Sequence, residues 1–193
     1  MKTRKMLRFL LLTIVVVFSA AIVQAQKKND MAAGLNLVCG TNSTLTNLGL
    51  GLKYQWNITN PIRLEPGFNY YFPKDLVGAK YNMWDLNVNV HYLFTIKERF
   101  LLYPLAGIGI LGSSIKYKYH DYYDDYGIYG GLVSAAVKEV EQKSTSTNFA
   151  FNIGGGAEYK INEKFAVNFE IKYQIVSNWN RPVFLVGATY KFK

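Results

Sequence analysis

The feature that most constrains this chain is an alternation of apolar and polar residues that recurs in segments of roughly ten residues. One segment is especially regular, with Leu48, Leu50, Leu52, Tyr54, Trp56 and Ile58 alternating with Asn47, Gly49, Gly51, Lys53, Gln55 and Asn57. A period of two places alternate residues on opposite faces of a β-strand. The pattern therefore predicts strands with one apolar face and one polar face.

The same alternation predicts eight strands along the chain. Six are regular and two are less clean, at 31–40 and 100–112; the regular segments are 47–58, 62–72, 84–94, 149–161, 165–175 and 182–192. The segment 100–112 is apolar on both faces, with Gly107 and Gly109 as an expected inward stripe. Pro66 and Pro104 fall inside strand patterns, and because proline removes a ladder donor we expect a bulge at each.

The first 25 residues have the three parts of a secretory signal peptide. Met1 to Arg8 holds four basic residues and no acid, an apolar run follows, and Val23-Gln24-Ala25 ends in a small residue. The apolar run is shorter than the roughly 20 residues that a membrane-spanning helix needs. We therefore predict a removed signal peptide at 1–25 and one domain at 26–193.

The net charge, the cysteine count and the aromatic content limit what kind of protein this can be. Loss of the four basic residues in the signal lowers the formal charge from +9 to +5. This modest excess argues against a nucleic-acid-binding protein, whose basic groups should cluster on one face. Cys39 is the single cysteine, so no internal disulfide can form. Aromatic residues make up 16% of the chain, which is typical of a barrel with aromatic belts at a membrane interface.

The alternating lengths of the connections and the positions of the aromatic residues along the barrel axis indicate a membrane barrel. Short turns at 57–61, 95–98 and 162–164 alternate with longer connections at 73–80, 113–147 and 176–181. The outward aromatics are expected in two belts, an outer one of Tyr70, Phe72, Trp84, Phe149, Phe151 and Tyr173, and a periplasmic one of Trp56, Tyr92, Phe94, Tyr159, Phe165, Tyr190 and Phe192. We predict an all-β fold, a closed eight-stranded antiparallel transmembrane β-barrel. A soluble periplasmic barrel is the alternative.

The polar faces of the strands carry balanced charges. Four basic and four acidic residues are predicted to form an inward network, namely Lys53, Arg63, Lys160 and Lys172 with Glu65, Asp85, Glu158 and Glu170. Buried charges are costly unless they are paired. Because an eight-stranded barrel is only wide enough for side chains to fill, we expect a filled polar lumen and no open channel.

The longest connection, 113–147, is the candidate interaction surface. Its tyrosines offer large contact area at a low entropic cost, and those singled out are Tyr117, Tyr119, Tyr122, Tyr123 and Tyr126. The alternative is that residues 116–126 simply extend a strand above the membrane. Asp121, Asp124 and Asp125 lack the spacing of an EF-hand loop, so no metal or other cofactor is expected.

Catalysis is a weaker hypothesis. Small barrels can act on lipid A at the outer rim, which requires a nucleophile and a base within hydrogen-bond reach. His120 and Asp121 lie in the long connection, a few residues after Ser113 and Ser114. His91 falls on the inner face near the periplasmic end, as a polar member of the lumen. We expect no enzyme, with a lipid A-modifying enzyme or a narrow pore as alternatives.

Several segments resemble the small outer-membrane β-barrel family that includes OmpX and the PorT-like proteins. The segments that carry the resemblance are 63–72, 102–109 and 155–160. The end of the chain is similar to the family's assembly signal, here Gly187, Tyr190 and Phe192, although Leu185 stands where a polar residue is usual and Lys193 follows the last aromatic. The resemblance implies insertion by the outer-membrane assembly machinery. It implies no single activity, because fold does not fix function.

These features predict a non-enzymatic barrel in the outer membrane of a Gram-negative bacterium, with both chain ends in the periplasm. Its expected role is structural or adhesive, through the connection 113–147. The expected partners are outer-membrane lipid, the assembly machinery and an extracellular protein or surface ligand, and not nucleic acid.

Overall fold

The computed structural model describes residues 27–42, 45–76, 79–122, 137–177 and 179–192, and only the backbone of 76, 118–122 and 137–141. The signal-peptide prediction at 1–25 lies outside these residues. No helix in the described part of the chain is long and apolar enough to cross a membrane. The strands are β1 (Met31–Thr41), β2 (Thr46–Asn57), β3 (Ile62–Leu76), β4 (Ala79–Tyr92), β5 (Phe94–Lys97), β6 (Phe100–Tyr122), β7 (Val137–Lys160), β8 (Phe165–Val176) and β9 (Arg181–Lys191).

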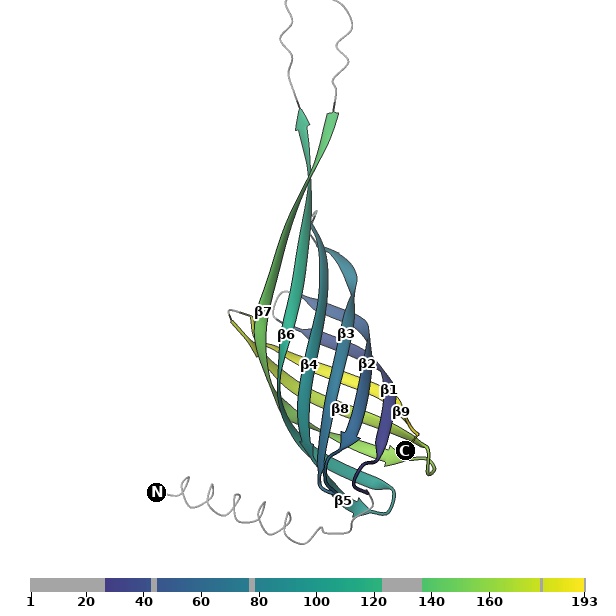
Figure 1. Cartoon of the computed structure of the whole chain (residues 1–193). Helices are drawn as coiled ribbons and strands as arrows, with labels where there is room; N and C mark the ends of the chain where they lie inside the picture. Colours follow the sequence, from purple (N-terminus) through teal and green to yellow (C-terminus); the bar gives the residue numbers. More distant parts are fainter. Residues whose placement is uncertain (1–26, 43–44, 77–78, 123–136, 178, 193) are drawn as a thin grey trace, which may run out of the picture.

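The strands form one closed antiparallel barrel. In ring order they run β4-β3-β2-β1-β9-β8-β7-β6, and the pairing of β4 with β6 closes the ring. The start of β1 and the end of β9 lie at the same end of the barrel (Figure 1). We call this the terminal end and the opposite one the hairpin end. The predicted closed antiparallel barrel is confirmed.

β4 and β5 are two parts of a single wall strand. His91 of β4 pairs with Leu105, and Phe94 of β5 pairs with Leu102, so both follow the same register along β6. The ladder is interrupted where β6 presents Pro104, which has no N–H to donate. Eight strands therefore make the wall, as predicted.

The prediction of a bulge at each of the two prolines is wrong. Pro66 pairs with Val88 and Pro104 pairs with Gly155 in unshifted register. The register shifts lie between Tyr71 and Lys74 and between Thr95 and Lys97, at strand ends. A missing donor at these prolines interrupts a ladder without inserting a residue.

The two faces of the wall have opposite character. The outward positions between the strand ends carry aliphatic and aromatic side chains that remain exposed on the isolated chain, and the inward positions are buried. Aromatic rings meet at the terminal end. The ring centres of Phe165 and Tyr190 are 5.1 Å apart, and those of Tyr92 and Phe94 are 4.8 Å apart. This inverted arrangement, apolar outside and polar inside, is typical of membrane barrels.

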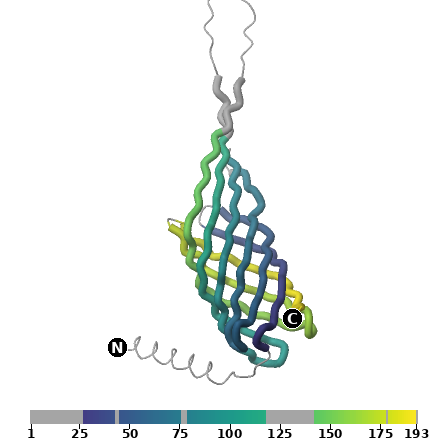
Figure 2. Tube along the Cα trace, in the orientation of Figure 1, coloured from purple at the N-terminus to yellow at the C-terminus, as the bar shows by residue number. Residues whose placement is uncertain are grey.

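β6 and β7 continue well beyond their neighbours as a two-stranded hairpin. β4 stops pairing with β6 at Tyr117, and β8 stops pairing with β7 at Ala150. The β6–β7 ladder continues to Tyr122 and Val137 (Figure 1). Figure 2 shows the teal and green traces of β6 and β7 rising together beyond the other strands. Much of the predicted connection 113–147 is therefore paired strand. We refer to residues 113–122 and 137–149 as the projecting hairpin, of which residues 113–117 still pair with β4.

Candidate functional site

The lumen near the terminal end is filled by ion pairs and hydrogen bonds. Arg63 of β3 reaches Glu158 of β7 across the barrel, with Nη1 2.7 Å from Oε2. Lys53 Nζ lies 3.6 Å from Glu65 Oε2 and donates a shorter, 2.7 Å bond to Asn168 Oδ1. All five side chains are buried. The Arg63–Glu158 and Lys53–Asn168 contacts thus link strands that are not neighbours in the sheet.

A layer of amides fills the middle of the lumen. Asn152 Nδ2 donates to Asn87 Oδ1 at 2.7 Å and to Asn89 Oδ1 at 3.1 Å. Inward glycines make room for these amides, because a Cβ on Gly109 would collide with the Asn87 side chain. Glycine alternation on the inner face therefore serves packing and not flexibility.

A second charge cluster lies toward the hairpin end. Arg181 Nη2 is 3.0 Å from Asp85 Oδ2, and the Arg181 guanidinium lies 4.4 Å from the Tyr71 ring centre. Asp85 also accepts hydrogen bonds from the Tyr71 hydroxyl at 2.7 Å, from Asn69 at 2.7 Å and from Asn87. Each carboxylate oxygen of Asp85 thus receives two donors.

Apolar side chains close the lumen beyond this cluster. The buried group consists of Val38, Leu45, Tyr71, Met83, Leu111, Ala150, Val176, Val183 and Leu185, with Tyr81 and Trp179 packed against it. The lumen is filled, as predicted, but its hairpin end is apolar. Leu185, the residue that departs from the family's assembly signal, is one of these side chains.

Seven of the eight predicted lumen charges are buried inward. They are Lys53, Arg63, Glu65, Asp85, Glu158, Glu170 and Lys172. Lys160 differs, since it is half-buried at the terminal end, where it is the last residue of β7 and lines a cavity. The prediction missed Arg181, which is 1% exposed. The sequence analysis places Arg181 in the connection 176–181, although it lies on the same side of the strand as Val183.

Three buried side chains converge at Glu65, and two of them, His91 and Glu170, have atoms without a hydrogen-bond partner within the described structure. Ligand-type atoms of Glu65, His91 and Glu170 all lie within 4.8 Å of one another. His91 stacks on Tyr103, with ring centres 4.6 Å apart and planes 7° from parallel. Both ring nitrogens of His91, and Oε1 of Glu170, have no hydrogen-bond partner within the described structure.

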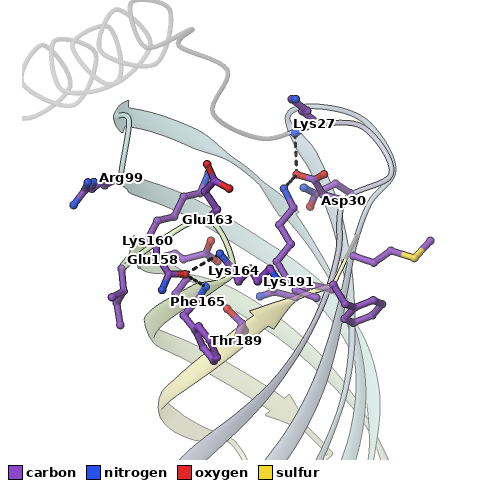
Figure 3. A pocket seen from close by; sticks show the side chains of 18 of the residues that line it. Lys27, Asp30, Arg99, Glu158, Lys160, Glu163, Lys164, Phe165, Thr189 and Lys191 are labelled. Carbon is purple, nitrogen blue, oxygen red and sulfur yellow. Dashed lines mark hydrogen bonds and ion pairs between the residues drawn. The ribbon is translucent and has the colours of Figure 1, made fainter.

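A cavity of about 780 Å³ opens at the terminal end. Figure 3 shows Lys27, Asp30 and Lys191 on one side of this opening, where Lys191 Nζ lies 2.6 Å from Asp30 Oδ2. Arg63 and Glu158 also line the cavity. The Arg63–Glu158 ion pair therefore forms part of its wall.

The projecting hairpin leaves the barrel at β7 residues 142–147. All six of these residues are exposed, whereas inward and outward residues of β7 alternate in exposure closer to the terminal end. Tyr117 is half-buried. Tyr119 and Tyr122 pair by backbone with Val140 and Val137. Tyr123 and Tyr126 lie outside the described residues.

The three assembly-signal residues lie on β9 and just after it. Gly187 faces inward, and a Cβ there would collide with the Asn36 side chain of β1. Tyr190 and Phe192 face outward, and the ring centres of Phe192 and Tyr54 are 6.1 Å apart. The three positions thus complete the seam between the first and last strands.

Residues 9–192 match the family described as "Outer membrane protein beta-barrel domain", and the chain belongs to that family. It is therefore an outer-membrane β-barrel protein of a Gram-negative bacterium, of the OmpX type. None of the curated protein sequences matches it.

Solved structures show the same fold at low sequence identity. Neisserial surface protein A is 12% identical, with a TM-score of 0.59 over 84% of this chain and 96% of that one. Ail of Yersinia pestis is 16% identical, with a TM-score of 0.53 over 86% and 99%. OprG of Pseudomonas aeruginosa is 14% identical, with a TM-score of 0.51 over 88% and 99%.

Proposed function

We propose that this protein is a surface attachment protein that binds an extracellular protein through the projecting hairpin. The observation that carries the proposal is the unpaired edge of β7. Residues 137–149 pair with β6 on one side and have no partner on the β8 side within the described structure. At the rise of a strand this edge is about 40 Å long. An exposed edge can accept a strand from another chain through backbone hydrogen bonds.

Polar composition keeps this edge soluble while leaving it able to pair. Lys143, Ser144, Thr145, Ser146 and Thr147 are exposed on both faces of the strand. Hydroxyl side chains do not obstruct an added strand, and threonine favours extended backbone. Of the tyrosines predicted for recognition, Tyr117, Tyr119 and Tyr122 belong to β6. A similar barrel, Ail, is described as the attachment invasion locus protein, which supports an attachment role.

The proposal also includes the orientation of the chain. With the terminal end in the periplasm, the hairpin projects outside the cell, where attachment takes place. The signal peptide at 1–25 would deliver the chain to the periplasm, and Gly187, Tyr190 and Phe192 would be read by the assembly machinery. Protease added to whole cells should cut only within the hairpin.

The attachment test uses a shortened hairpin. Ser113 pairs with Ser146, so replacing residues 114–145 by Asn-Gly joins two paired positions with a favoured hairpin turn and removes most of the unpaired edge of β7. Cells that display the full-length protein should bind immobilised extracellular-matrix proteins, and cells with the shortened form should not. D75N/K80Q is the control, because it alters exposed charges of β3 and β4 at the same end. Equal binding by the shortened form would refute the hairpin as the site.

We also propose that the barrel is neither an enzyme nor a pore. His120 lies six residues along β6 from Ser114, which is about 20 Å at the rise of a strand, too far for one catalytic site. The filled lumen favours a closed barrel. Lipid A mass spectra should be identical with and without the protein, and planar bilayers should show no channel steps. Altered lipid A or steady conductance would contradict this proposal.

A further inference from the structure

We propose that Glu65, His91 and Glu170 form a site for a divalent first-row transition metal ion in the lumen, reached from the terminal end. The three residues come from β3, β4 and β8. Their ligand-type atoms lie within 4.8 Å of one another. One imidazole and two carboxylates are a donor set typical of Zn²⁺. The site goes beyond the proposed attachment function and does not depend on it.

Unsatisfied atoms point independently to a ligand. His91 is 0% exposed, and neither of its ring nitrogens has a hydrogen-bond partner within the described structure. Glu170 is 1% exposed, and its Oε2 receives one long bond, 3.4 Å from the Tyr103 hydroxyl. A buried carboxylate oxygen and a buried imidazole that lack hydrogen-bond partners are each costly. A metal ion bound to both would satisfy them together.

The neighbouring basic side chains leave the metal-binding oxygen of Glu65 available. Arg63 is engaged by Glu158. Lys53 and Gln55 both approach Oε2 of Glu65, at 3.6 and 2.8 Å. Oε1 of Glu65 instead faces His91, with Nε2 3.8 Å away. The oxygen that would bind metal is therefore not the one held by lysine and glutamine.

Geometry allows the site to close on an ion. Zn²⁺ binds nitrogen and carboxylate oxygen at about 2.0–2.2 Å, which puts tetrahedral ligand atoms about 3.4 Å apart. The present separations therefore have to shrink by roughly 1 Å, within reach of small glutamate side-chain rotations. Stacking on Tyr103 holds the His91 ring in place. Three protein ligands leave a fourth position for water.

The metal would link opposite walls of the barrel. β3 and β8 are separated by four steps in either direction around the ring of eight strands, so Glu65 and Glu170 lie on facing walls. The terminal cavity supplies an entry path, because it is lined by Gln55, Arg63 and Glu158. Gln55 is hydrogen-bonded directly to Glu65. One layer of side chains separates the cavity from the site.

Zinc binding by the refolded, tag-free chain of residues 26–193 tests this proposal. The protein is treated with chelator, titrated with zinc chloride by calorimetry, and dialysed before its metal content is measured. We expect one Zn²⁺ per chain. Removal of a ligand should weaken binding at least about a hundredfold, the upper range for changes in a metal's outer shell, in H91Q and in E170Q.

Matched controls separate this site from adventitious binding. The chain has two histidines, so H120Q removes the other imidazole and should leave binding unchanged. E98Q/E163Q removes two carboxylates that line the terminal cavity, and should also leave it unchanged. Absence of retained zinc in the unaltered chain, or equal affinity in H91Q and E170Q, would overturn the proposal.

A spectroscopic measurement remains decisive even if the ligand variants do not refold. Zinc X-ray absorption of the H120Q chain should show one imidazole and otherwise oxygen ligands. A spectrum without imidazole would exclude His91 and overturn the site.

Discussion

Replacing Arg181 by methionine should destabilise the barrel by about 3 kcal/mol, because it removes one partner of a buried ion pair. Arg181 is 1% exposed, and its guanidinium bonds Asp85 at 3.0 Å and Gln174 at 2.8 Å. Breaking such a pair typically costs 3–5 kcal/mol. The lower end applies because Asp85 keeps its bonds from Asn69, Asn87 and Tyr71.

The expected loss corresponds to a little over a hundredfold in the folding equilibrium, at 1.4 kcal/mol for each factor of ten. Urea-dependent folding into lipid vesicles measures it, with gel mobility as a second probe of the folded barrel. R181M/D85N removes both charges and should lose only about 1 kcal/mol, since a pair replaced as a unit leaves no unpaired charge.

A surface pair provides the control for this experiment. Lys191 is 40% exposed in its side chain and lies 2.6 Å from Asp30. K191M should therefore cost less than about 1 kcal/mol. If R181M costs no more than K191M, or if the effects of R181M and D85N simply add, the assigned role of the buried pair is refuted.

Three further changes test other parts of the barrel. Gly156→Leu places a side chain against the Tyr103 ring, so the refolded fraction on gels should fall sharply; normal refolding would contradict the packing of the inner face. Val186→Lys puts a charge on the outward face midway along β9, and should cost about 2–4 kcal/mol in vesicle unfolding; an unchanged midpoint would argue against lipid contact there. Asn152→Leu removes the 2.7 Å hydrogen bond to the side-chain oxygen of Asn87. It should cost about 1–3 kcal/mol in the same assay; no loss would mean that water replaces the Asn152 amide as donor.

Alternation along the strands was sufficient to predict the wall and most of the inner face. Successive side chains of a strand point to opposite faces, and this alternation can be read from a few residues. Lys53, Arg63 and Glu65 could therefore be assigned inward from their immediate neighbours. Arg181 could have been found by extending the parity of β9 by one residue. Pro104 is predicted to carry a bulge, whereas it interrupts the ladder with β4 and β5, because sequence indicates a missing donor but does not reveal whether the register shifts.

Contacts across the lumen could not be predicted in this way. The meeting of Glu65 with Glu170 depends on the relative heights of β3 and β8, which lie on opposite walls and never pair. Those heights are set by the stagger accumulated around the closed sheet. His91 was expected to be a polar lumen residue, but its stacking on Tyr103 depends on the same stagger. The acidic residues weighed as metal ligands were instead those of the projecting connection, because they are adjacent in sequence.

The central claim is that hydrocarbon contacts the outward face and that the lumen is closed to it. The three tryptophans test both parts, since Trp56 and Trp84 face outward while Trp179 packs against the apolar cluster inside. Single-tryptophan variants refolded into vesicles containing lipids brominated in their acyl chains give the measurement. The account predicts strong fluorescence quenching of Trp56 and Trp84 and little quenching of Trp179. Quenching of Trp179 alone, or equal protection of all three, would contradict it.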